Sequence, residues 1–230
     1  MRATYLNPLK IQASYQLKGE QAHHLLNVVR VAINEEILLL DGAGLMVKTQ
    51  VSEISKRELT LQTLEHDEVS RKYNLDLALG IPKKEALELS LKQAVELGFR
   101  KIYLIRSTYS QNRIPDIERI KSLLISALEQ SNGVFFPEII QTEWNGIRFE
   151  DYENALMLDS QSKSFNPKKA HDKFAANLLI VGPEGGFSQQ EMTFLHVLPN
   201  ISVLNLPTPI LRTPTAVATG AGIILGSLLD

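Results

Sequence analysis

The chain has 230 residues, of which 44% are hydrophobic and 22% are charged, an ordinary composition for a globular protein of one or two domains. It contains no cysteine, which excludes disulfide bonds, thiolate catalysis and thiolate metal ligands and fits a reducing cytoplasm. The net charge of −2 gives no global attraction to nucleic acid, so an RNA partner needs a local basic surface.

Short apolar runs separated by turn sequences occupy the first part of the chain. They cover residues 11–17, 37–40, 45–54 and 59–64. Short strands joined by tight turns predict a small β-barrel. One helix is expected inside this region, over residues 20–29, because its apolar residues recur at helical spacing. His23 and His24 point in different directions on that helix, so we expect solvated or hydrogen-bonded side chains and no shared metal.

The composition becomes polar and charged over residues 65–72, and a different pattern follows. Apolar runs typical of strands now alternate with segments typical of helices. The expected strands cover residues 75–81, 102–105, 138–141, 155–159, 177–181 and 201–206, and the expected helices cover residues 83–97 and 115–130. This alternation predicts a parallel sheet with helices on both faces. We therefore divide the chain into domains at residues 1–70 and 71–230.

A glycine-rich loop follows the expected strand 177–181. Its sequence is Gly-Pro-Glu-Gly-Gly over residues 182–186, and Ser188 with Glu191 forms a Ser-x-x-Glu capping box that opens a helix. Bare backbone at the carboxyl end of a parallel strand allows a ligand to approach N–H and C=O groups directly. The alternative is a tight turn that uses glycine only for positive φ. Gly185 is expected either to adopt positive φ or to leave room for the ligand.

A second irregular loop, residues 207–212, also separates a strand from a helix. Thr213 is expected to cap that helix and Pro214 to occupy its first position. The helix itself, expected over residues 216–229, is nearly uncharged and rich in small residues, which predicts a homodimer formed through it. It is too short and too rich in Thr and Gly for a membrane span, and no signal peptide is visible at the N-terminus.

The sequence does not indicate that these loops bind a nucleotide phosphate. Neither Gly-x-Gly-x-x-Gly nor the P-loop pattern occurs, and Glu184 inside the first loop would repel a phosphate. The absence of cysteine and of a histidine cluster also predicts no metal site. These observations favour a ligand without phosphate.

The motifs GPEGGFS and LRTPTA together resemble the RsmE family of ribosomal RNA uridine methyltransferases, which belongs to the knotted SPOUT superfamily. Further agreement lies in residues 23–30, 83–98, 129–131 and 137–139, so the resemblance covers nearly the whole chain. It implies an α/β protein with an N-terminal PUA-like, RNA-binding β-barrel at 1–70. A SPOUT methyltransferase domain at 71–230 would follow, with a trefoil knot in roughly 155–230. The final helix would join the dimer interface.

The resemblance also implies that S-adenosylmethionine is the cofactor, bound between three loops at strand ends. The implied cofactor-binding residues are Leu158, Val181, Gly182, Pro183, Glu184, Gly185, Gly186, Leu206, Ile210, Leu211 and Thr213. The implied reaction is methylation of N3 of a uridine in small-subunit ribosomal RNA, either free or in the assembled subunit. Uracil N3 carries a proton at neutral pH, so the enzyme must help to remove it and must stabilise the resulting anion.

Arg212 is the candidate for stabilising that anion or for holding the target phosphate. The alternative is a surface arginine in a salt bridge at the start of a helix. Glu129, Glu184 and water are the candidates for the base. The basic residues expected to bind RNA are Arg30, Lys83, Arg106, Lys168 and Lys169. The last two belong to loop 161–173, which has a local charge of +3 and is either an RNA contact or a solvated loop.

The chain departs from the family pattern at three places. Pro207, Thr208 and Pro209 stand where many relatives have Gly-Pro-Arg, Pro214 replaces a Glu, and residues 132–136 lack the usual arginines. A divergent SPOUT protein that binds RNA and cofactor, with another RNA target or without methyl transfer, is therefore the alternative. A small-molecule α/β enzyme without an RNA partner is the third hypothesis.

Overall fold

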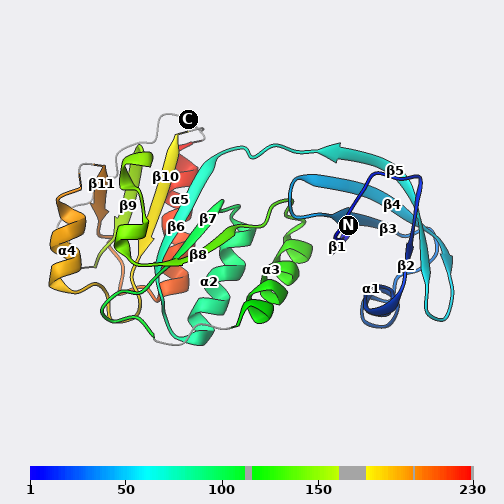
Figure 1. Cartoon of the computed structure of the whole chain (residues 1–230), viewed down its shortest axis with the longest axis horizontal. Helices are drawn as coiled ribbons and strands as arrows, with labels where there is room; N and C mark the ends of the chain where they lie inside the picture. Colours follow the sequence, from blue (N-terminus) through cyan, green and yellow to red (C-terminus); the bar gives the residue numbers. More distant parts are fainter. Residues whose placement is uncertain (112–115, 161–174, 199, 229–230) are drawn as a thin grey trace. The chain divides into compact units, whose positions relative to one another are not determined.

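Figure 1 shows the computed structural model of the chain, which describes residues 1–111, 116–160, 175–198 and 200–228. The chain forms two compact units, each built around its own sheet. The first unit contains residues 1–70 and 128–135, and the second contains residues 71–127 and 136–230. The polar segment near residue 70 thus lies at the junction, whereas nothing in the sequence indicates that residues 128–135 belong with the first unit.

The first unit contains a five-stranded sheet with the order β1-β3-β4-β5-β2. The strands are β1 (Arg2–Tyr5), β2 (Ser14–Leu17), β3 (Glu36–Leu40), β4 (Leu45–Ile54) and β5 (Leu59–Glu68). β1 is parallel to β3, and the other pairs are antiparallel. Side chains such as Ile37, Val47 and Leu61 are fully buried in its core. The short β1 was not expected from the sequence.

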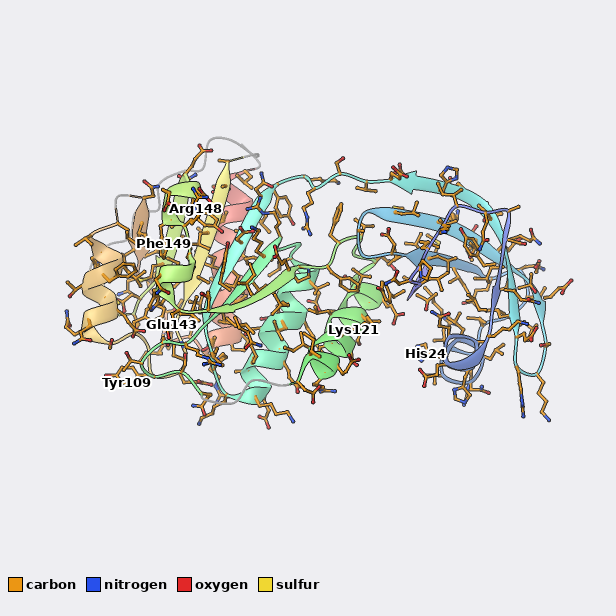
Figure 2. All side chains as sticks on the ribbon, viewed as in Figure 1. His24, Tyr109, Lys121, Glu143, Arg148 and Phe149 are labelled. Atoms are coloured by element: carbon orange, nitrogen blue, oxygen red, sulfur yellow. The ribbon has the colours of Figure 1, made fainter. Side chains whose placement is uncertain are left out.

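The expected helix of the first unit is present but is not uniform. It begins as α1 (Gly19–His23) and continues as a π-helix, η1 (His24–Val29), which ends where Arg30 adopts a left-handed φ of 58°. The helix buries Ala22 and Leu25. His23 and His24 are exposed, as expected, and Figure 2 shows His24 at the surface.

The second unit contains a six-stranded parallel sheet with the order β11-β9-β10-β6-β7-β8. The strands are β6 (Asn74–Gly80), β7 (Lys101–Ile105), β8 (Glu138–Thr142), β9 (Asn154–Leu158), β10 (Ala176–Val181) and β11 (Ile201–Leu204). Their carboxyl ends therefore meet at one edge, called here the carboxyl edge. The strand order reverses direction between β6 and β10, which makes that edge a switch point where such sheets bind ligands.

Helices cover both faces of this sheet, which confirms the prediction. The helices are α2 (Lys84–Glu96), α3 (Ile117–Ser131), α4 (Gln189–His196) and α5 (Thr213–Ser227), with short 3₁₀ turns η2 (Trp144–Gly146) and η3 (Phe149–Asp151). α5 packs on β9 and β10 and beside α2 (Figure 1). Gly220 permits this approach, because a Cβ there would lie 2.5 Å from Leu179 Cδ1. Leu195 of α4 packs against Leu178 and Ile180 on the opposite face.

A buried carboxylate on β6 has a structural role in the same sheet. Asp76 is fully buried and accepts two hydrogen bonds from the Arg100 guanidinium, at 3.0 and 2.8 Å. It also accepts from the Lys101 N–H and from the Tyr152 hydroxyl, at 3.1 and 2.7 Å. Burial and hydrogen bonds to Tyr103 and Asp76 raise the Tyr152 pKa well above its usual range, so this hydroxyl stays a donor.

Candidate functional site

Three strands with loops of interest end side by side at the carboxyl edge. β9 lies between β10 and β11, and Leu158 at the end of β9 pairs with Leu204 at the end of β11. The Asp159 N–H donates to the Leu204 carbonyl at 3.0 Å, which continues this pairing beyond the strands. The loops that start at Asp159, Gly182 and Asn205 therefore leave the sheet as neighbours. The structure thus brings together the strand ends from which the cofactor-binding residues were predicted.

The loop after β10 contains a tight turn over residues 183–186. The Gly186 N–H donates to the Pro183 carbonyl at 2.9 Å, and Gly186 has a φ of 70°. Only this glycine of the loop has positive φ, and a Cβ on it would meet nothing within 4 Å. Gly185 does not have positive φ, so that expected reason was wrong. A Cβ on Gly185 would lie 2.9 Å from Tyr109 Cβ, which makes room for Tyr109 a further reason for this glycine, and room for the ligand stays a prediction.

Neighbouring elements fix this turn in place. The Thr213 hydroxyl at the start of α5 donates to the Gly182 carbonyl at 3.2 Å. The Glu184 carboxylate accepts from the Lys83 N–H at 3.0 and 3.2 Å, at the amino end of α2, where the helix dipole favours a negative charge. Pro183 packs on Gly80, where a Cβ would lie 2.5 Å from Pro183 Cδ. The turn is therefore preorganised, and nothing in these contacts supports Glu184 as a base.

The start of α5 differs from the expectation. The capping residue is Arg212, Thr213 is the first helical residue and Pro214 is the second. Thr213 was expected to cap the helix, and this was wrong because its hydroxyl bonds to the Gly182 carbonyl instead. Pro214 is tolerated at the second position because the backbone N–H groups of the first turn have no partner within the helix.

Glu191 joins three loops of the carboxyl edge. The predicted capping box is confirmed: the Ser188 N–H donates to Glu191 Oε2 at 2.8 Å, and the Ser188 hydroxyl accepts from the Glu191 N–H at 3.3 Å. Glu191 Oε1 also accepts from the Thr108 N–H and the Trp144 indole N–H, both at 3.0 Å. The loops after β7, β8 and β10 are thereby linked. Burial alone would raise the pKa of Glu191, but these hydrogen bonds outweigh it and hold the pKa below its usual range.

Glu191→Gln is expected to destabilise the protein by roughly 1–3 kcal/mol at pH 7, because an amide offers one acceptor oxygen where the carboxylate uses two. A depressed pKa contributes stability above the unfolded-state pKa of about 4.3 and loses it as the pH falls through the folded-state value. The difference between variant and wild type should therefore shrink below about pH 4. Urea unfolding at pH 7 and below about pH 4 measures this difference in the free energy of unfolding. Glu150→Gln, at an exposed carboxylate, is the control, and equal stability of both variants at pH 7 would contradict the role of Glu191.

Arg212 lies at the surface of the carboxyl edge. Its carbonyl accepts from the Ala216 N–H at 2.9 Å, and its side chain is exposed. Within the described ranges no acidic side chain forms an ion pair with it, so the alternative of a salt-bridged arginine finds no support. Ile210, two residues earlier, is 84% exposed, whereas Leu206 and Leu211 are half-buried. An apolar side chain and a guanidinium are therefore both presented on this loop.

The other predicted residues are distributed over the chain. Lys83 and Arg106 are exposed and follow β6 and β7 at the carboxyl edge. Arg30 is exposed and belongs to the first unit. Glu129 also belongs to that unit, where its carboxylate accepts from the Tyr5 N–H at 2.8 Å, which gives no support to a role as the base. Lys168 and Lys169, with the rest of loop 161–173, lie outside the described residues.

Two residues of this edge were missed by sequence reasoning. Trp144 donates its indole N–H to Glu191, and Tyr109 lies beside Gly185 with 52% of its surface exposed. An aromatic residue in a polar loop after a strand was the available signal for Tyr109. Among the described residues, no cluster of three His, Cys, Asp or Glu side chains has the proximity a metal site needs, and no helix combines the length and apolarity of a membrane span.

Family comparisons cover both units. The family described as "RNA methyltransferase domain" matches residues 69–225, and the family described as "RNA methyltransferase PUA domain" matches residues 17–64. Ribosomal RNA small subunit methyltransferase E of Rickettsia conorii is 32% identical over 206 residues, which cover 86% of this chain and 83% of that protein. The protein of the same name from Bacillus subtilis is 23% identical over 221 residues, which cover 88% of this chain and 86% of that protein.

Solved structures share the fold along nearly the whole chain. A crystal structure of ribosomal RNA small subunit methyltransferase E from Neisseria gonorrhoeae, bound to S-adenosyl methionine, has a TM-score of 0.83 at 24% identity, and the match covers 98% of this chain and 97% of that one. A methyltransferase structure from Legionella pneumophila with bound S-adenosylmethionine has a TM-score of 0.80 at 23% identity and the same coverage.

Proposed function

Because this chain belongs to the family of ribosomal RNA small subunit methyltransferase E, we propose that it transfers a methyl group from S-adenosylmethionine to N3 of a uridine in small-subunit ribosomal RNA. Its fold is that of a PUA domain followed by an RNA methyltransferase domain. The observation that carries the proposal is the preorganised turn of residues 183–186, held at the switch point of the sheet by Thr213 and Lys83.

Two features of the carboxyl edge support this cofactor. Gly186 has open space where a side chain would stand, and the ends of β9, β10 and β11 lie side by side around the turn of residues 183–186. Bound S-adenosylmethionine supplies an electrophilic methyl group on a positive sulfonium. Within the same site, the Arg212 guanidinium has the fixed charge that the uracil anion needs during its formation. The carboxylates of Glu129 and Glu184 accept hydrogen bonds from backbone N–H groups, and these bonds give neither residue support as the base. Another side chain or water then removes the proton from N3.

Methyl transfer by the purified protein tests the proposal directly. The substrates are small-subunit RNA and assembled small subunits from a strain without this gene, each incubated with methyl-labelled S-adenosylmethionine. Mass spectrometry of the digested nucleosides should find label in 3-methyluridine. Label at a different position would favour the divergent alternative raised by Pro207, Pro209 and Pro214. Absence of label from both substrates would reject the proposal.

We further propose that the protein is a cytoplasmic homodimer that meets RNA partly through Arg30 and the PUA domain. α5 supports the dimer, since Gly222 and Gly226 are exposed and a Cβ on either would meet nothing within 4 Å. The knot implied by the resemblance stays a prediction, because part of it falls on residues 161–174.

Gly222→Glu is expected to convert the dimer to a monomer, because it adds a charge to the surface that would be buried against the second copy. A Cβ at position 222 would meet no atom of the same chain within 4 Å, so the monomer should still fold. Light scattering at micromolar concentration, with circular dichroism to verify folding, measures the effect. A dimeric Gly222→Glu variant, or a monomeric wild type, would contradict an interface at α5.

A further inference from the structure

Tyr109 is an exposed aromatic residue beside the turn of residues 183–186. It lies in the loop after β7, and 52% of its surface is exposed. Figure 2 shows its side chain projecting from the surface of the second unit. Its Cβ lies 2.9 Å from where a Cβ on Gly185 would stand, so the absence of a side chain on Gly185 makes room for this residue.

The backbone that presents Tyr109 is locked by hydrogen bonds on both sides. The Ser110 N–H donates to the Ser107 carbonyl at 3.0 Å, and the Ser110 hydroxyl accepts from the Ser107 N–H at 3.0 Å and donates to the Ile105 carbonyl at 3.0 Å. The Thr108 N–H is held by Glu191, and the Gln111 N–H donates to the Ile81 carbonyl at 2.9 Å. Because this backbone is held in place, only the side chain of Tyr109 has to lose conformational freedom when a ligand covers the ring.

The chemistry around the ring suits an RNA strand. Arg106, three residues earlier, and Lys83, at the amino end of α2, are both exposed cations of the same edge. Single-stranded RNA is bound by aromatic rings that stack on its bases and by cations that contact its phosphates. A half-exposed ring at an edge that also carries exposed cations therefore matches a nucleobase and the phosphates next to it.

We propose that Tyr109 stacks on a base of the RNA substrate and so positions the strand beside the cofactor turn of residues 183–186. This inference rests on the proposed function. It assigns to the loop after β7 a specific contact that the family motifs GPEGGFS and LRTPTA do not contain. The contact between Tyr109 and Gly185 would keep the stacked base in register with the methyl donor.

Tyr109→Leu tests the stacking, because leucine keeps the Cβ beside Gly185 and much of the apolar volume but has no ring. We expect KM for RNA to rise roughly tenfold to a hundredfold, in line with the usual strength of base stacking, with unchanged affinity for S-adenosylmethionine. Tyr109→Phe should stay within about twofold of the wild type, since the ring is retained. Phe194→Leu is the matched control, because Phe194 is a 40% exposed aromatic residue on α4 and should leave KM unchanged.

The outcomes separate this inference from the proposed function. A wild type that methylates no RNA would reject the function, and anisotropy of a labelled small-subunit RNA fragment would still compare binding by wild type and Tyr109→Leu. Equal KM and equal RNA affinity for these two proteins would overturn the stacking. Weakened binding of S-adenosylmethionine by Tyr109→Leu would assign the ring to the cofactor and overturn it as well. If Tyr109→Phe loses as much RNA affinity as Tyr109→Leu, the effect belongs to the hydroxyl group and the stacking is overturned too.

Discussion

Arg212→Ala is expected to lower methyl transfer to small-subunit ribosomal RNA by roughly a hundredfold or more, which is the usual effect of removing a group that stabilises a developing oxyanion. The guanidinium is exposed beside the loop of the proposed cofactor site, and the described residues contain no ion-pair partner for it. A guanidinium with no ion-pair partner among these residues is available to an anion on the substrate.

Arg212→Ala should remove the guanidinium without disturbing the start of α5. Arg212 caps α5 through its backbone only, since its side chain makes no capping hydrogen bond, and alanine keeps the carbonyl that accepts from Ala216. Affinity for S-adenosylmethionine, measured by calorimetry, should therefore stay nearly constant. Arg148→Ala, at another exposed arginine, is the control for loss of surface charge. A normal rate in Arg212→Ala would remove this residue from the mechanism.

The second large effect is expected at the cofactor turn. Gly186→Val should weaken S-adenosylmethionine binding roughly tenfold to a hundredfold or more, because a branched residue at positive φ is strained by about 1–3 kcal/mol and its side chain fills space left open at the site. Calorimetry measures the affinity. Gly185 is the poorer choice for this test, since a side chain there collides with Tyr109 before it reaches a ligand.

The chain supplies a matched control for the strain itself. Gly19 has a φ of 63° against 70° at Gly186, and a Cβ on either residue would meet nothing within 4 Å. Gly19 lies in the first unit, so Gly19→Val carries similar backbone strain and should bind S-adenosylmethionine normally. Equal affinities of a folded Gly186→Val variant and the wild type would exclude the turn from the cofactor site.

Local patterns in the sequence determined most of the secondary structure and the most specific motif. The alternation of strands and helices after residue 70 predicted the parallel sheet, and Ser188 with Glu191 predicted the start of α4. Both depend on residues close in the chain, where periodicity and capping act directly. The GPEGGFS and LRTPTA segments likewise indicate the family, because each is a contiguous run of residues.

Contacts between residues distant in the chain were decided only by the tertiary structure. The Glu184 carboxylate bonds to an N–H 101 residues away, and Glu191 bonds to Thr108 and Trp144 across separations of 83 and 47 residues. No local pattern records which strand becomes the neighbour of β6, and that order decides which loops meet at the carboxyl edge. The sequence by itself therefore determined most of the elements and the family motif. The partners of Glu129, Glu184 and Thr213 and the place of Tyr109 followed from packing, because each depends on a distant segment that only the folded sheet brings near.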